Sequence, residues 1–311
     1  MSFVTHYGLF LLESITIVIA LLLLFVGLIS IGRNPKPKLS IISLNEHYEN
    51  LTDRMKKEIF KKKSKRKKKN KTIKPTVFVL DFAGDIKASQ VDALRDEITA
   101  VLSIAGKDDE VCLRLESPGG SVNGYGLAAA QLQRLRDKNI PLTACIDTVA
   151  ASGGYLMACV ANKIIAAPFA IIGSIGVVAQ LPNFHRLLNK NNIDVELLTA
   201  GEYKRTLTLF AENTEKGRKK FQEDIEQIHQ TFKAHVLAHR PQLDMDAVAT
   251  GEHWLAVDAF RLNLVDALKT SDEVLCSKME TFQLFSIKMH VKHSLFTKLL
   301  KPAIKLLHPW A

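Results

Sequence analysis

Three segments of the chain hold residues that together can cleave a peptide bond. Ser152 is followed by two glycines, Lys204 comes 52 positions later, and a Ser-Pro-Gly-Gly turn at residues 117–120 precedes both. A serine hydroxyl is a weak nucleophile at neutral pH and needs a base, which a lysine can supply as well as a histidine. A glycine turn offers backbone N–H groups to the oxygen of the reacting carbonyl. The pattern predicts a serine peptidase with a nucleophile, a base and an oxyanion hole.

Ser152 follows a short apolar strand and a turn, so we expect it at or near the N-terminus of a helix. There, free N–H groups and a partial positive charge face the negative charge that develops during attack. The glycines at 153 and 154 let a substrate backbone approach closely. Lys204 can act as a base only when it is neutral, which burial or the neighbouring Arg205 would favour. A lone loop lysine is usually a solvated surface residue, so the interpretation depends on its spacing from Ser152.

Four motifs stand in the order found in bacterial signal peptide peptidases. They are Ser-Pro-Gly-Gly-Ser-Val at 117–122, Ala-Ser-Gly-Gly-Tyr at 151–155, Gly-Ser-Ile-Gly-Val at 173–177 and Gly-Glu-Tyr-Lys-Arg at 201–205. The chain resembles the signal peptide peptidase A / SohB family of Ser-Lys serine peptidases. An N-terminal apolar segment, Leu-Asn-Glu-His-Tyr at 44–48 and a basic linker are similar to its SohB branch. The resemblance covers nearly the whole chain.

The resemblance implies roles for two further residues. Gly119 matches the oxyanion-hole glycine of the family, and Ser174 matches the hydroxyl placed to hydrogen-bond the lysine. The alternative for Ser174 is a serine that satisfies the backbone of its own turn. Asn263 departs from the family pattern because a glycine is usual there, but Asn tolerates the left-handed conformation at a helix end, so we expect the turn to be kept.

The resemblance also implies a crotonase-like or ClpP-like fold and extended apolar substrates such as released signal peptides. A homo-oligomer is implied as well, in which neighbouring copies share the active site.

Short apolar runs alternate with helical segments from residue 76 onward. Strands alternating with crossover helices imply an α/β class with a mainly parallel sheet covered on both faces. The periodicity predicts strands at 77–80, 111–115, 141–146, 163–167 and 195–199, and helices at 89–102, 124–136, 152–160, 183–190, 214–239 and 257–263.

The apolar pattern of the N-terminal region predicts a single transmembrane helix before this domain. Residues 15–31 form an apolar run long enough for one membrane crossing. No positive residue precedes the run and no small-x-small cleavage site follows it, so a retained anchor is expected instead of a cleaved signal peptide. We therefore expect a single-pass membrane protein, and the resemblance to a bacterial family implies the inner membrane.

Charge is concentrated just after this run. Residues 33–74 hold 16 Lys and Arg against 4 Asp and Glu, although the whole chain carries only +10. The positive-inside bias places this side in the cytoplasm, whereas the better-known relatives act from the periplasmic side. The side of the catalytic domain is left open.

Composition divides the chain into four regions. They are an N-terminal segment at 1–32, a basic linker at 33–75, a peptidase domain at 76–275 and an amphipathic C-terminal tail at 276–311. The linker is expected to contact anionic lipid headgroups and not nucleic acid, because the anchor lies beside it. The helical spacing of apolar residues near the C-terminus fits either a membrane surface or a helix packed on protein.

No metal or cofactor is expected. His235 and His239 lie four residues apart and can share a helix face, but the sequence implies no further ligand. The four cysteines form no C-x-x-C pair, and three of them lie in apolar runs, which indicates buried free thiols.

Two other functions fit the same residues. A crotonase-fold enzyme acting on acyl thioesters would keep its activity without Lys204, because that chemistry uses acidic residues in the pocket. A non-catalytic membrane scaffold or peptide-binding protein would still work as Ser152→Ala. The hypothesis favoured by the motifs is a membrane-anchored serine endopeptidase that cleaves apolar peptides.

Overall fold

The computed structural model describes residues 3–32, 38–61 and 74–290. The chain forms two compact units, one from residues 1–40 and 289–311 and one from residues 41–288. The first unit contains helix α1 (Phe3–Gly32). Among the described residues, no helix combines the length and apolarity that a membrane crossing requires. The lysines at 62–69 and the helical pattern at 295–310 lie outside the described residues.

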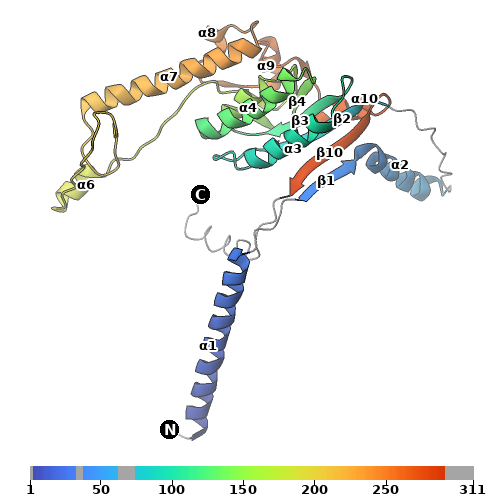
Figure 1. The fold of residues 1–311 in the computed structure, drawn as a ribbon. Helices are drawn as coiled ribbons and strands as arrows, with labels where there is room; N and C mark the ends of the chain where they lie inside the picture. Colours follow the sequence, from blue (N-terminus) through green and yellow to red (C-terminus); the bar gives the residue numbers. More distant parts are fainter. Residues whose placement is uncertain (1–2, 33–37, 62–73, 291–311) are drawn as a thin grey trace. The chain divides into compact units, whose positions relative to one another are not determined.

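The second unit is built on a seven-stranded sheet in the order β1-β10-β2-β3-β4-β6-β9. The pairings from β10 through to β9 are all parallel, which confirms the predicted parallel α/β architecture (Figure 1). The strands are β1 (Lys38–Ser43), β2 (Thr76–Ala83), β3 (Glu110–Glu116), β4 (Leu142–Ile146), β6 (Lys163–Ala166), β9 (Ala267–Leu268) and β10 (Gln283–His290).

Helices cover both faces of this sheet. The helices of the second unit are α2 (Leu44–Phe60), α3 (Val91–Ile104), α4 (Val122–Asp137), α5 (Gly153–Ala158), α6 (His185–Lys190), α7 (Glu215–His239), α8 (Met245–Val248), α9 (Ala256–Arg261) and α10 (Ser271–Lys278).

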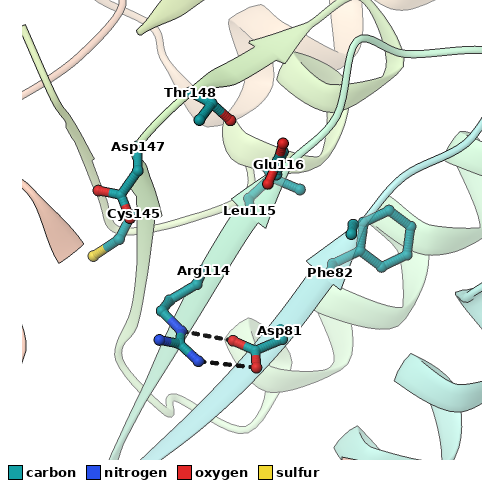
Figure 2. Close-up of a pocket in the computed structure, with 9 residues that line it drawn as sticks. Asp81, Phe82, Arg114, Leu115, Glu116, Cys145, Asp147 and Thr148 are labelled. Atoms are coloured by element: carbon teal, nitrogen blue, oxygen red, sulfur yellow. Dashed lines mark hydrogen bonds and ion pairs between the residues drawn. The ribbon is translucent and has the colours of Figure 1, made fainter. Parts of the chain in front are cut away.

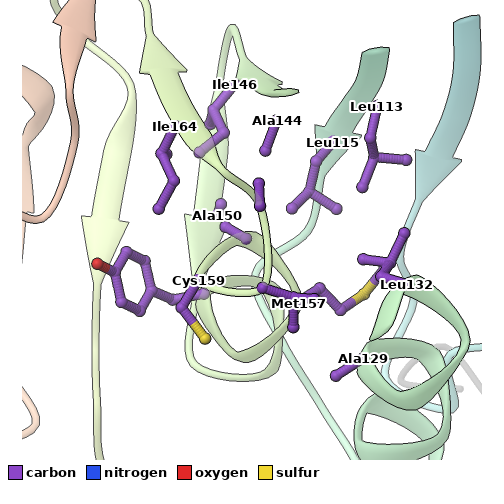
Figure 3. Close-up of a cluster of buried hydrophobic side chains, with 14 of the residues drawn as sticks. Leu113, Leu115, Ala129, Leu132, Ala144, Ile146, Ala150, Met157, Cys159 and Ile164 are labelled. Carbon is purple, nitrogen blue, oxygen red and sulfur yellow. The ribbon is translucent and has the colours of Figure 1, made fainter. Parts of the chain in front are cut away.

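Alternate residues of the strands serve two separate hydrophobic clusters. Leu113 and Leu115 of β3 pack in the larger cluster with Leu132 of α4 and Met157 of α5 (Figure 3). Cys112, which directly precedes Leu113 in β3, belongs to the smaller cluster with residues of α10. Because both faces of the central strands are buried, their sequences are continuous apolar runs.

A second, three-stranded sheet carries the segment that leads to Ser152. Strand β5 (Val149–Ala151) pairs in parallel with β7 (Ile171–Gly173), which pairs antiparallel with β8 (His253–Leu255). A bridge between Ser117 and Ala150 joins the end of β3 to β5. The two sheets therefore bring the glycine turn after β3 beside the end of β5.

Several segments differ from their predicted structure. The strand expected at 195–199 is wrong, since residues 191–214 contain no helix or strand, and Leu198 is 90% exposed. An apolar run with no partner strand in the same chain has nothing to complete its hydrogen bonds. Strand β10 lies within the segment that the sequence assigned to a tail, and residues 283–286 pair with β2. Asn263 has a φ of 61° after α9, which confirms that asparagine keeps the turn.

Candidate active site

Ser152 is held in a backbone conformation that few residues other than glycine adopt. Its φ is 52° and its ψ is −119°, at the N-cap of α5. Its N–H donates to the carbonyl of Gly173 at 2.8 Å, and its own carbonyl accepts from Leu156 at 2.9 Å. Such a conformation costs about 1–3 kcal/mol and persists only where the surroundings impose it. The predicted position of Ser152 at a helix N-terminus is confirmed.

Three glycines permit the close packing around this turn. A Cβ added to Gly119 would lie 2.7 Å from the Cβ of Ser152 and 2.8 Å from the nitrogen of Gly153. A Cβ on Gly153 would lie 2.4 Å from Cγ of Tyr125, and one on Gly154 would lie 2.4 Å from the carbonyl oxygen of Ser117. The structure therefore places Gly119 directly against the nucleophile candidate and the first N–H groups of α5.

A buried hydrogen-bond chain lies beneath the glycine turn. The Tyr125 hydroxyl donates to the carbonyl of Asp85 at 2.8 Å and lies 2.6 Å from Oγ of Ser117. Because its only proton is used on Asp85, the Ser117 hydroxyl must donate to Tyr125. Oγ of Ser117 in turn accepts the N–H of Gly119 at 3.1 Å. Burial raises the pKa of Tyr125, so the phenol stays protonated and the chain keeps its direction.

These hydrogen bonds determine which backbone groups of the glycine turn face the cavity. The N–H of Gly119 is directed at Ser117, and Gly119 is buried. Gly120 is exposed and lines the cavity together with Ser152 and Gly153. In this conformation Gly120 of the turn and Gly153 of α5 are the glycines beside Ser152 that line the cavity.

The cavity beside Ser152 has a volume of about 500 Å³. Its walls come from α4, α5, the segment at 176–178 and α7, and most of its large side chains are apolar. The lining includes Val122, Tyr125, Ala129, Leu156, Val177, Val178, Ile228 and Phe232. An apolar peptide segment fits the chemistry of these walls.

Ser174 lies close to Ser152 along the second sheet. It follows Gly173, whose carbonyl accepts the hydrogen bond from the Ser152 N–H. The N–H of Ser174 donates to the backbone carbonyl of Glu252 at 2.6 Å. Its φ of 53° places it in a second strained turn. The structure therefore brings Ser152, Gly119 and the backbone of Ser174 into one neighbourhood.

Lys204 is placed apart from this neighbourhood within a single chain. Its side chain is exposed, and it does not line the cavity that contains Ser152. The ring centroid of the adjacent Tyr203 lies 5.9 Å from Nζ of Lys216 and 5.9 Å from Nζ of Lys220, both in the first turns of α7. The α7 residues that line the cavity begin later, at Asp224. Figure 1 shows α6, in the same segment, extending away from the sheet.

The sequence did not reveal that Tyr125 and His235 belong to the cavity that contains Ser152. Tyr125 is fully buried, and its one sequence signal is a large aromatic residue between two glycines of α4. His235 of α7 lines the cavity, and burial, followed by the charge of His239, lowers its pKa. Its signal was the four-residue spacing to His239, which by itself did not point to the cavity.

A second, smaller cavity of about 240 Å³ lies near the carboxyl ends of β2 and β3 (Figure 2). Arg114 donates to both oxygens of Asp81 at 2.6 and 2.9 Å. The thiol of Cys145 also lies there, and a hydrogen bond with Cys112 together with burial raises its pKa. Because Arg114 is paired with Asp81 and the Cys145 thiol stays protonated, this cavity offers no activated nucleophile.

Comparison with known proteins identifies relatives over most of the chain. Residues 134–284 match the model described as Peptidase family S49, and residues 2–132 match the one described as Peptidase family S49 N-terminal. A probable protease SohB of Haemophilus influenzae is 48% identical over 94% of this chain and 91% of its own length. Another, from Buchnera aphidicola subsp. Schlechtendalia chinensis, is 46% identical over 89% of this chain and 100% of its own length.

Among solved structures, the 1510-N membrane-bound stomatin-specific protease is similar with a TM-score of 0.41 and 17% identity. The similarity covers 67% of this chain and 86% of that chain.

The packing of Gly153 on Tyr125 predicts the effect of one added methyl group. In Gly153→Ala the new Cβ must displace α5 or the buried ring, and Ser152 with it. We expect kcat/KM on an apolar fluorogenic peptide to fall about 10²-fold, as a shift of about 1 Å can produce.

The matched control is Gly106→Ala, whose new Cβ would meet nothing closer than Oδ2 of Asp109 at 3.5 Å. It should retain the wild-type rate. Equal rates for the two variants would contradict the role given to this contact.

Proposed function

Because the chain belongs to peptidase family S49 and is a serine protease, we propose that Ser152 is its nucleophile and Lys204 its general base. The observation that carries the proposal is the strained turn of Ser152 at the N-terminus of α5, which opens on an apolar cavity. Strain of this kind is maintained mainly at functional sites.

The proposed reaction is an acyl transfer in two halves. Oγ of Ser152 attacks the peptide carbonyl while its proton passes to the neutral amine of Lys204. The N–H of Gly153 and the turn at Gly119 and Gly120 stabilise the oxyanion. Lys204 then gives the proton to the leaving amine, and water releases the acyl group from Ser152 by the reverse sequence.

The hydrogen bond from Gly119 to Ser117 bears on the oxyanion hole. An N–H that already donates to Oγ of Ser117 is less available to a substrate oxygen. We propose that the Gly119 role is met by the turn as a unit, with Gly120 as the cavity-facing donor in the conformation described.

We propose that Lys204 reaches Ser152 from a neighbouring copy of the chain. Three features of a single chain support this. Lys204 is exposed, it lies outside the cavity, and the segment at 178–210 that contains it exposes many apolar side chains. The exposed apolar residues of this segment are Val178, Leu181, Phe184, Leu187, Ile193, Val195, Leu197, Leu198, Tyr203, Leu209 and Phe210. A surface of this kind is typical of a subunit interface. Ser174 is proposed to orient the incoming amine.

The proposed substrates are extended apolar peptides, of which released signal peptides are one class. The support is the apolar lining of the cavity and the close approach allowed by the glycines around Ser152.

We further propose that the N-terminal segment anchors the protein in the membrane. Residues 15–31 contain no charged side chain, and the lysine-rich linker that follows suits anionic headgroups. Alkaline carbonate extraction should leave the full-length protein with the membrane and release a form that lacks residues 1–32. Release of both forms would contradict the anchor.

A shared active site predicts complementation between two inactive variants. Ser152→Ala and Lys204→Ala should each lower kcat by about 10⁴-fold when assembled alone, as loss of a catalytic group does in other serine peptidases. Co-expressed with different tags and purified as mixed oligomers, they should regain activity. Random mixing places an intact serine beside an intact lysine at about one quarter of the sites.

The outcomes separate the alternatives. Mixed oligomers without activity would place both groups in the same chain. A fully active Lys204→Ala variant would remove the lysine from the mechanism and favour the thioester hypothesis. The control mixture of Ser152→Ala with itself under both tags should stay inactive.

A further inference from the structure

Three potential metal ligands meet where the end of α5 packs on the last turns of α7. Cys159 is the C-cap of α5, and His235 and His239 lie one turn apart on α7. One ligand atom from each lies within 4.8 Å of the others. Cys159 is fully buried (Figure 3) and both histidines are half-buried. The sequence showed only the histidine pair, and the fold supplies the third ligand.

Hydrogen bonds orient both imidazole rings. Nε2 of His235 lies 3.2 Å from the carbonyl of Leu156, and Nε2 of His239 lies 2.7 Å from Oε1 of Gln133. The amide nitrogen of Gln133 donates to Asp137 at 2.8 Å, which fixes Oε1 as the atom that faces His239. Both Nε2 atoms therefore act as donors. Metal-binding histidines are commonly oriented in this way, by a second partner on the ring nitrogen away from the metal.

The remaining nitrogen of each ring is then the potential ligand. Nδ1 of His239 lies 2.8 Å from the carbonyl of His235. Metal binding at this nitrogen would require the ring to turn away from that carbonyl. The Cys159 thiol donates to the carbonyl of Leu156 at 3.2 Å and would give up its proton on metal binding.

We propose that Cys159, His235 and His239 form a Zn²⁺ site. One thiolate and two imidazoles are ligands that Zn²⁺ prefers, and three protein ligands leave a fourth position for water. On binding, the thiol proton of Cys159 passes to solvent, and no oxidation or reduction occurs.

The site would act on the wall of the Ser152 cavity. His235 lines that cavity, and α5 carries Ser152 at one end and Cys159 at the other. A metal ion held by both helices would fasten α7 to α5 and stabilise the cavity wall. Its role is structural, so it can be tested without reference to peptidase activity.

The test is a Co²⁺ titration of the full-length protein in detergent after chelator treatment. We expect one Co²⁺ per chain with a thiolate-to-cobalt charge-transfer band, and competition by Zn²⁺ that removes the band. At a Zn²⁺ concentration 100-fold above Kd, Tm should rise by about 5 °C.

Variants assign the ligands. Cys159→Ser should abolish the charge-transfer band, and His239→Gln should weaken binding at least 10-fold. Cys276→Ser is the matched control, because Cys276 is the exposed cysteine of α10, and it should bind as the wild type does. Absence of the band from the wild type, or a band that persists in Cys159→Ser and is lost in Cys276→Ser, would overturn the proposal. If Cys159→Ser does not fold, unchanged binding by His239→Gln would overturn it as well.

Discussion

The backbone conformation of Ser152 is the constraint that the surrounding architecture must satisfy. A residue with a side chain at φ 52° and ψ −119° must be held there by its neighbours. The register of β5 with β7 supplies the hydrogen bond from Ser152 to Gly173. Gly119 provides the space for the Ser152 side chain, and Tyr125 supports the first turn of α5 from below. Two sheets and two helices thus converge on one residue.

The same convergence explains why Ser117 and Gly119 of the glycine turn are buried. Ser117 is completely buried, and it joins β5 through its backbone and Tyr125 through its hydroxyl. In our proposal, these contacts of Ser117 hold the turn in place before substrate arrives. Preorganised donors of this kind account for much of the rate enhancement in acyl transfer. In our proposal one chain provides the nucleophile, the turn and an apolar cavity, and a neighbouring chain provides the base.

Much of this arrangement could be predicted from local sequence. Alternating apolar runs and helical segments indicate the parallel sheet, and a serine followed by two glycines after a strand indicates a helix N-terminus. The apolar run at 195–199 misled the strand prediction, because periodicity cannot reveal whether a partner strand exists. The Asp85–Tyr125–Ser117–Gly119 chain could not be predicted, since its four residues lie on three separate segments that only the fold brings together. The meeting of Cys159 with α7 was hidden for the same reason.

The central claim is that the strained serine at the start of α5 is the reactive one. The most direct measurement is labelling of assembled wild-type protein with a fluorophosphonate, followed by peptide mapping by mass spectrometry. The account predicts a single modified residue, Ser152, and no labelling of protein that was heat-denatured before the reagent was added, because activation requires the folded turn. Modification of another serine that tracks the loss of peptidase activity, or hydrolysis that continues with Ser152 fully labelled, would contradict it.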